Sequence, residues 1–282
     1  MNKNLVYDIG MCDGSDTRKY LSLGYDVVAV EADPTLVEKA KRKFSNYIKS
    51  GRLKIINVGI TQERGTDTFY VNDAMPIWNS FDKEITGRDN MPYREIKITC
   101  VPFADIIEEH GVPFYLKIDI EGNDIYCVRD LKPGNLPKYV SLEADNKADL
   151  ESLDALRDVG YTKFQCINQN TFTPVSVPYE MKLNPGKMNF NDRLYLQVMY
   201  NKNFFIRALR KFKGREIFKF LLNPSSNLTY QIGTSGPFGE LLPNDWLTYD
   251  QVKTEFLESF RSFDERHPNS SYGFWCDFHA TY

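Results

Sequence analysis

Leu5-Val6-Tyr7-Asp8-Ile9-Gly10-Met11-Cys12-Asp13-Gly14-Ser15-Asp16 is the stretch of sequence that decides the fold. It predicts a buried strand that breaks into a glycine turn, and the turn opens a helix. A second apolar run over 27–33 reaches Glu31 at the spacing of about 20 residues expected of a nucleotide-binding βαβ unit. Gly10 and Gly14 would let the backbone approach a ligand, and Glu31 would accept hydrogen bonds from ribose hydroxyls. We therefore expect an adenosine-containing cofactor.

The side chains around the turn favour S-adenosylmethionine over a dinucleotide. A dinucleotide site has the pattern G-x-G-x-x-G, because the pyrophosphate lies on bare helix amides. Here Cys12 takes the second glycine position, and three carboxylates surround the turn. They suit a cationic sulfonium and an ammonium group, at roughly 4 kcal/mol per close pair before desolvation. This pattern also disfavours a nucleotide-dependent oxidoreductase. The predicted cofactor-binding residues are Asp8, Gly10, Cys12, Asp13, Gly14, Asp16, Glu31, Ala32 and Asp119. The alternative is that Asp13 or Asp16 only caps the helix.

A second cluster follows the apolar run that begins at Phe114. The alternation of side chains places Lys117 and Asp119 on one face of a strand, near its carboxyl end. Charged side chains are costly in a parallel sheet covered on both faces, unless they have a use. Ligands bind at the carboxyl ends of such strands. We therefore expect this cluster to belong to the same site as the glycine turn.

The string Lys117-Ile118-Asp119-Ile120-Glu121-Gly122, with Asp8-Ile9-Gly10-x3-Gly14 upstream, resembles the FkbM family of S-adenosylmethionine-dependent O-methyltransferases. Residues 235–240, Trp246 and residues 275–280 resemble the C-terminal signature of many bacterial members. One departure is Cys12-Asp13, where the family often has Ala-Asn. The resemblance implies a Rossmann-like class I methyltransferase fold and methyl transfer to a hydroxyl of a sugar or polyketide. The competing hypothesis is a non-catalytic cofactor- or glycan-binding module with the same fold.

Methyl transfer to a hydroxyl needs a positioned acceptor and a base for its proton. Asp119 is the leading candidate for the base, and the other catalytic candidates are Glu121, Lys117 and Glu143, which ends a later strand. Several alternatives stay open. Asp119 would contact the methionine end of the cofactor, Lys117 would neutralise Asp119, and Glu121 would cap the following helix. Asp119, Glu143 and Asp145 are a conceivable metal set, but no metal site is predicted.

Strand and helix signals alternate along the first 167 residues, which predicts an α/β fold with a mostly parallel seven-stranded sheet and helices on both faces. We expect residues 1–167 plus 272–282 to form the cofactor-binding core and residues 168–271 to form an inserted cap over the acceptor. Strands are expected at 4–9, 26–31, 53–58, 114–120, 138–144, 161–167 and 272–278, with extra strands at 66–71 and 96–101. Helices are expected at 15–23, 34–47, 103–110, 123–131, 147–159, 203–222 and 249–262.

Composition limits the partners. A net charge of −3 and a pI near 5.8 argue against general nucleic-acid binding, which needs a broad basic surface. Five scattered cysteines without a C-x-x-C pair give no disulfide framework. Without a signal peptide or an apolar membrane-spanning run, we expect a cytoplasmic protein. The basic helix over 203–222 would contact a membrane surface, an anionic glycolipid or a nucleotide-sugar phosphate, or would simply be solvated. The expected acceptor is a sugar, either free, nucleotide-linked or within a glycan.

Overall fold

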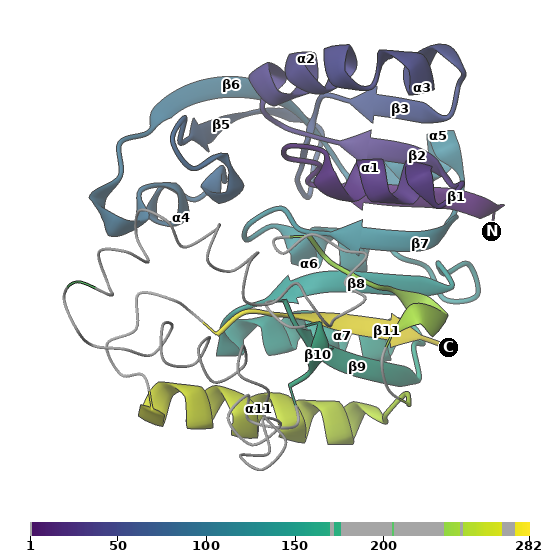
Figure 1. Ribbon diagram of the computed structural model, residues 1–282, viewed down its shortest axis with the longest axis vertical. Helices are drawn as coiled ribbons and strands as arrows, with labels where there is room; N and C mark the ends of the chain where they lie inside the picture. Colours follow the sequence, from purple (N-terminus) through teal and green to yellow (C-terminus); the bar gives the residue numbers. More distant parts are fainter. Residues whose placement is uncertain (1, 170–171, 176–204, 206–233, 243–244, 267–273) are drawn as a thin grey trace.

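The computed structural model describes residues 2–169, 172–175, 205, 234–242, 245–266 and 274–282. Its main sheet has the strand order β10-β9-β11-β8-β7-β1-β2-β3 (Figure 1). In this sheet β3, β2, β1, β7 and β8 pair in parallel, whereas β11 is antiparallel to both β8 and β9. The two-residue strand β10 adds an edge to the seven predicted strands, so the mostly parallel α/β fold is confirmed. The bounds are β1 Asn2–Ile9, β2 Asp26–Val30, β3 Leu53–Ile56, β7 Pro113–Ile118, β8 Tyr139–Ala144, β9 Lys163–Asn168, β10 Thr173–Pro174 and β11 Cys276–Thr281.

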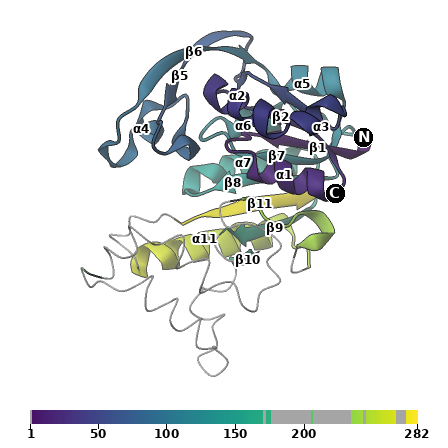
Figure 2. The same ribbon diagram turned by 45° about the horizontal axis from the view of Figure 1, so that its top comes forward.

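Helices cover both faces of this sheet (Figures 1 and 2). The larger core lies on the face covered by α5, α6, α7 and α11, where Phe256 packs on Phe278. On the other face, Tyr20 of α1 and Phe238 both pack on Tyr115 of β7. The bounds are α1 Ser15–Ser22, α2 Pro34–Lys43, α3 Ser45–Lys49, α5 Phe103–His110, α6 Asp124–Arg129, α7 Leu150–Val159 and α11 Tyr249–Arg266.

A small second sheet projects beside the first, with the order β4-β6-β5. It contains β4 Gly59–Ile60, β5 Gly65–Val71 and β6 Arg94–Val101. These include the two extra strands expected from the sequence. The connection from β5 to β6 carries the short helices η1 Pro76–Trp78, α4 Lys83–Thr86 and η2 Arg88–Asn90. It is anchored by Asn72, whose side chain donates to the Thr86 carbonyl and accepts from the amides of Ala74 and Met75. This connection reaches the site described below.

Several predicted bounds were wrong. The helix expected over 34–47 is two helices, because Phe44 leaves helical geometry at φ −109°. The strand expected over 114–120 ends at Ile118, and the final strand spans Cys276–Thr281 instead of 272–278.

Part of the segment assigned to the cap lies against the sheet. In α11, Phe256 and Val252 are fully buried on the sheet, and Phe238 stacks on Tyr115 with ring centroids 3.9 Å apart. Both parts therefore add to the core. The helix expected over 203–222 falls outside the described residues except for Phe205, and the division into core and cap stays a prediction.

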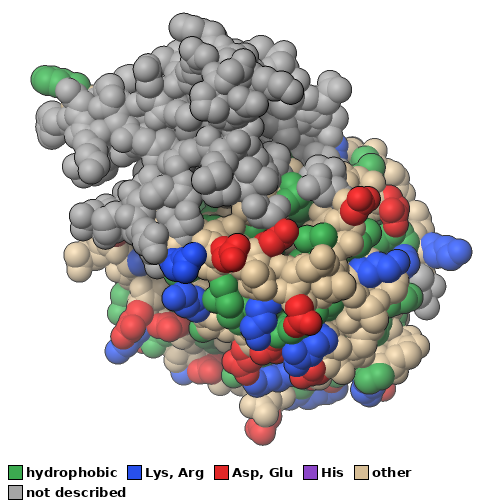
Figure 3. Space-filling model, turned by 90° about the horizontal axis from the view of Figure 1, so that it is seen from below, with side chains coloured by type: hydrophobic (Ala, Val, Ile, Leu, Met, Phe, Trp, Pro, Cys, Tyr) green, Lys and Arg blue, Asp and Glu red, His purple; other side chains and the backbone are tan. Residues whose placement is uncertain are grey.

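Figure 3 shows the molecule from below the view of Figure 1. On the described part of this face, Lys and Arg side chains are interspersed with Asp and Glu. Of the helices that the structure describes, none combines the length and the apolar character needed to cross a membrane.

Candidate functional site

Close contacts within the protein leave no room for a side chain at positions 10 and 14, so both must be glycine. Gly10 has φ +84°, and a Cβ atom there would lie 1.7 Å from the carbonyl oxygen of Asp119. Gly14 has φ +74°, and a Cβ atom would lie 2.6 Å from the ring of Phe44. Our expectation placed a ligand against these glycines. In the structure the close approach brings the turn after β1 onto the end of β7, so contact with a cofactor stays a prediction.

Glu31 follows β2 and is held by backbone amides. Its two carboxylate oxygens each accept a hydrogen bond of 2.8 Å, one from the Cys12 amide and one from the Asp33 amide. Burial is the main cause that raises the pKa of Glu31 to about 7. The Ala32 carbonyl accepts from the side chain of Asn57. The arrangement fixes the Glu31 carboxylate beside the glycine turn.

Cys12 lies in this turn with φ +48°, and burial is the main cause that raises the pKa of its thiol to about 12. Its thiol is thus protonated at neutral pH, and the backbone amide is the Cys12 group that contacts Glu31. Cys12 therefore holds Glu31 through its backbone amide and not through its thiol, so it uses only a group that a glycine at this position would also have.

Lys117 is the buried centre of the site. It lies opposite Asp8 in the pairing of β1 with β7 and is 2% exposed. Its ammonium nitrogen is 3.2 Å from Asp8 Oδ1 and 3.4 Å from Asp119 Oδ2, and it donates to the Gly10 carbonyl at 2.7 Å. Burial alone lowers the pKa of Lys117, but the nearby carboxylates outweigh it, and the pKa lies well above its usual value. Lys117 therefore stays charged and holds the two strand ends together.

The two carboxylates near the start of α1 differ in their surroundings. Asp16 is buried and accepts from the Ser235 amide at 3.2 Å, and burial raises its pKa to about 7. Asp13 is exposed and accepts from the Ser15 amide. The helix itself has no side-chain cap. Asp16 thus links the first turn to a segment far along the chain, whereas Asp13 faces solvent.

Three catalytic candidates gather where β7 and β8 end. Asp119, Glu121 and Glu143 each offer an oxygen, and these oxygens lie within 4.8 Å of one another. The trio differs from the metal set considered in the sequence, because Glu121 takes the place of Asp145, which is exposed.

The two glutamates are shifted toward the protonated form. Burial, with the charge of Asp119, raises the pKa of Glu121 to about 8 and that of Glu143 well above its usual value. Glu121 also forms an ion pair of 2.8 Å with Arg88, and its carbonyl accepts from Ser80 Oγ. It does not cap α6, which has no side-chain cap. These two carboxyls therefore release their protons at higher pH than an ordinary glutamate does.

The sequence did not indicate several residues that complete the site. Asp277 lies opposite Glu143 in the pairing of β11 with β8 and is 4% exposed. Its position in the C-terminal signature was a signal, although no role followed from it. Arg88 and Ser80 come from the β5–β6 connection and contact Glu121. The sequence suggested that the loop over 72–94 helps to select the substrate, but it assigned no role to either side chain.

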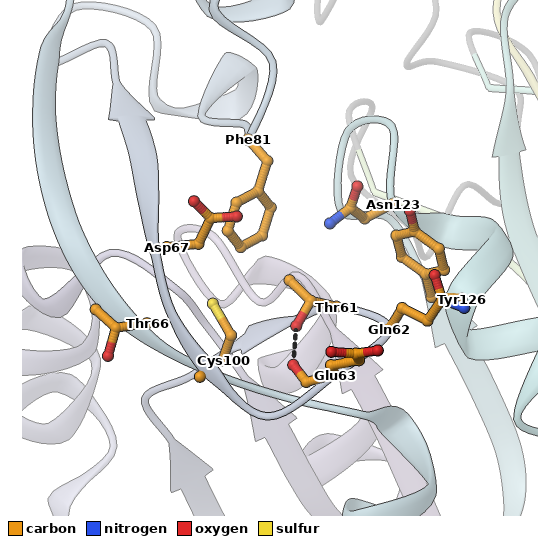
Figure 4. A pocket seen from close by; sticks show the side chains of 10 residues that line it. Thr61, Gln62, Glu63, Thr66, Asp67, Phe81, Cys100, Asn123 and Tyr126 are labelled. Atoms are coloured by element: carbon orange, nitrogen blue, oxygen red, sulfur yellow. Dashed lines mark hydrogen bonds between the residues drawn. The ribbon is translucent and has the colours of Figure 1, made fainter.

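A separate cavity of about 370 Å³ lies between the small sheet and α6. Figure 4 shows Asp67 and Phe81 on one side and Asn123 and Tyr126 on the other. Its lining includes none of the predicted site residues.

Comparisons with known proteins identify similar sequences and folds. The family model described as Methyltransferase FkbM domain matches residues 8–162. Among solved structures, methyltransferase FkbM from Methylobacillus flagellatus is 15% identical with a TM-score of 0.40, over 56% of this chain and 38% of that chain. Precorrin-6y C5,15-methyltransferase from Geobacter metallireducens is 15% identical with a TM-score of 0.34, over 60% of this chain and 69% of that chain. The chain thus spans less than half the length of the first of these structures. A search of curated proteins finds no significant relative.

Proposed function

The chain belongs to the FkbM methyltransferase family, and from this premise we propose that it transfers a methyl group from S-adenosylmethionine to a hydroxyl of a sugar or glycan. The observation that carries the proposal is the group formed by Asp119, Glu121 and Glu143 beside the Gly10 turn. It places proton-accepting carboxylates at the carboxyl edge of the sheet, where ligands bind in open α/β folds.

The residues around the turn fit the cofactor. Each oxygen of Glu31 accepts one backbone hydrogen and keeps a further lone pair, which suits the two ribose hydroxyls. Asp119 lies across the turn with its side chain 39% exposed, where it would accept from the ammonium of the methionine part. S-adenosylmethionine supplies an electrophilic methyl group on a positively charged sulfur. The carboxylates of the site favour that positive charge.

We assign the general base to Glu143. Its carboxylate lies where β8 ends, with an oxygen within 4.8 Å of those of Asp119 and Glu121. Burial and the four carboxylates around it raise the pKa of Glu143 well above its usual value, which makes it a stronger proton acceptor than an ordinary glutamate. In its ionised form Glu143 takes the proton of the acceptor hydroxyl while that oxygen attacks the methyl carbon. Asp119, the leading candidate from the sequence, lies beside Lys117 and is better placed to hold the cofactor. Arg88 keeps Glu121 beside the other two carboxylates.

Two isosteric variants test these roles. Glu143→Gln should lower kcat by about 100-fold or more, the usual contribution of a general base, and leave the Kd of S-adenosylmethionine within twofold. Asp119→Asn should raise that Kd at least tenfold by calorimetry. A loss of kcat in Asp119→Asn alone, with an unchanged Kd, would return the role of base to Asp119. Adding EDTA to the wild type tests whether the three carboxylates act through a metal ion.

The acceptor class is tested with labelled cofactor. Free sugars, methyl glycosides, nucleotide sugars and a glycolipid should be compared for transfer of a labelled methyl group, with Glu143→Gln as the inactive control. Transfer to at least one saccharide is the expected result. Tight cofactor binding without transfer to any of them would favour the non-catalytic module.

A further inference from the structure

The carboxylates of the site continue across the sheet beyond the residues assigned above. Asp277 of β11 lies opposite Glu143 of β8 and opposite Ile167 of β9. Residues directly opposite in a ladder present their side chains on the same face. Asp119 comes next in the register after the pair Ile118 and Leu142, so Asp119, Glu143 and Asp277 form one row. With neighbouring strands about 4.8 Å apart, this row spans about 10 Å.

Gln169 lies at the end of the same face. Its amide donates to the Trp275 carbonyl at 3.2 Å and so extends the ladder one step beyond the pair of Asn168 and Cys276. Side chains alternate along a strand, so Gln169 is on the same face as Ile167 and Asp277, one row nearer the carboxyl edge. Gln169 is 2% exposed. Within the part of the chain that the structure describes, neither its Nε2 nor its Oε1 has a hydrogen-bond partner.

A buried amide without partners is costly, and folded proteins rarely retain one without a reason. A carboxylate and an amide side by side suit a polyhydroxylated ligand. The carboxylate accepts from two neighbouring hydroxyls, and the amide both donates to and accepts from a third. A carboxylate on the ligand would be disfavoured here, because it would lie beside Glu143 and Asp277, which face each other on neighbouring strands and whose pKa values are already raised by burial and by the carboxylates around them.

We propose that Asp277 and Gln169 form an acceptor-binding subsite that recognises hydroxyls of an uncharged sugar next to the hydroxyl that is methylated. This inference rests on the proposed function and adds to it the residues that select the acceptor. The row runs from the cofactor side at Asp119, through the base Glu143, to Asp277, and Gln169 lies next to its end, one row nearer the carboxyl edge. A sugar lying along it presents one hydroxyl to the base and its neighbours to the subsite.

The test compares methyl transfer to uncharged methyl glycosides and to the corresponding methyl glucuronide. Gln169→Met removes the amide at similar volume, and Asp277→Asn removes the charge while keeping the shape. Gln165→Met is the matched control, because Gln165 is equally buried on β9 but lies four residues farther from the carboxyl edge. Gln169→Asn, which withdraws the amide by one methylene, serves if the methionine variant does not fold.

Gln169→Met should raise the acceptor KM at least tenfold, while kcat and the Kd of S-adenosylmethionine stay within twofold and the Tm does not fall. Asp277→Asn should raise the KM of the glycoside and narrow the gap between glycoside and glucuronide. Gln165→Met should leave the acceptor KM unchanged. Transfer to a glycoside with a KM that neither Gln169→Met nor Asp277→Asn alters would overturn the subsite and leave the proposed function intact. A wild type that binds the cofactor but methylates no saccharide would overturn both.

Discussion

Replacing Lys117 by methionine should destabilise the fold strongly. The substitution leaves the Asp8 carboxylate fully buried, still accepting from Thr17 Oγ1 at 2.5 Å but without its ammonium partner, and it removes the hydrogen bond to the Gly10 carbonyl. Removing one partner of a buried ion pair costs about 3–5 kcal/mol, because the other charge stays buried without compensation. Since 1 kcal/mol shifts the Tm of a domain of this size by about 2–4 °C, the Tm should fall by roughly 6–20 °C.

Urea unfolding, followed by circular dichroism, measures this loss directly. The matched control is Lys54→Met, because Lys54 forms an exposed ion pair with Glu109 at 2.6 Å and should lose at most about 1 kcal/mol. The double variant Lys117→Met with Asp8→Asn removes both charges and should recover at least half of the lost stability. The reasoning is refuted if the single variant loses less than about 1 kcal/mol, or if the double variant is no more stable than the single one.

Three further predictions concern the glycine turn, the pH dependence and the cofactor. Gly10→Ala should lower the free energy of unfolding by at least about 4 kcal/mol, because the added Cβ would overlap the Asp119 carbonyl. Gly24→Ala has open space around the added Cβ, so only the strain of an alanine at φ +98° should lower its stability, by about 1–2 kcal/mol. Equal losses for the two variants in urea titrations would contradict this prediction. Between pH 6.5 and 8 the free energy of unfolding should fall as pH rises, because the folded state holds protons on carboxyls with raised pKa values, about 8 for Glu121 and about 7 for Glu31, that the unfolded chain has already released. Glu121 alone accounts for about 1.6 kcal/mol over this window, and a flat profile by chemical denaturation would argue against the shift. Glu31→Gln should weaken S-adenosylmethionine binding at least tenfold by calorimetry, and an unchanged Kd would remove Glu31 from the cofactor site.

The parallel part of the fold could be predicted because each strand there is a short apolar run that ends in a turn signal. The same logic failed at Ile120, where apolar alternation continues but the strand has already ended at Ile118. The chain turns at Asp119 so that its carbonyl lies against Gly10, and only a contact over more than one hundred residues reveals this. The alternation of apolar and polar residues indicates which side chains are buried, but it does not indicate where the hydrogen bonding between two strands ends.

The site was predictable where strand register alone brings residues together. Lys117 and Asp8 are direct partners in neighbouring strands, so two motifs at strand ends were enough to place them side by side. The contacts from Arg88 to Glu121 and from Ser235 to Asp16 join residues that are 33 and 219 positions apart in sequence, and each contact involves a residue outside the regular strands and long helices. Loop conformation has no periodic signal, so these contacts had to be observed.

The position of β11 affects the order in which the protein can be assembled during synthesis. This strand comes after every other described element in the sequence, yet it lies between β8 and β9. Until it is made, the facing edges of β8 and β9 have unpaired backbone groups, which are prone to pair with other chains. The roughly one hundred residues between β9 and β11 take about 5–20 s to translate at 5–20 residues per second. During that interval the nascent chain is exposed to aggregation. A chaperone that shields the edges of β8 and β9 should therefore raise the yield of folded protein more than one that acts on β1, β2 and β3.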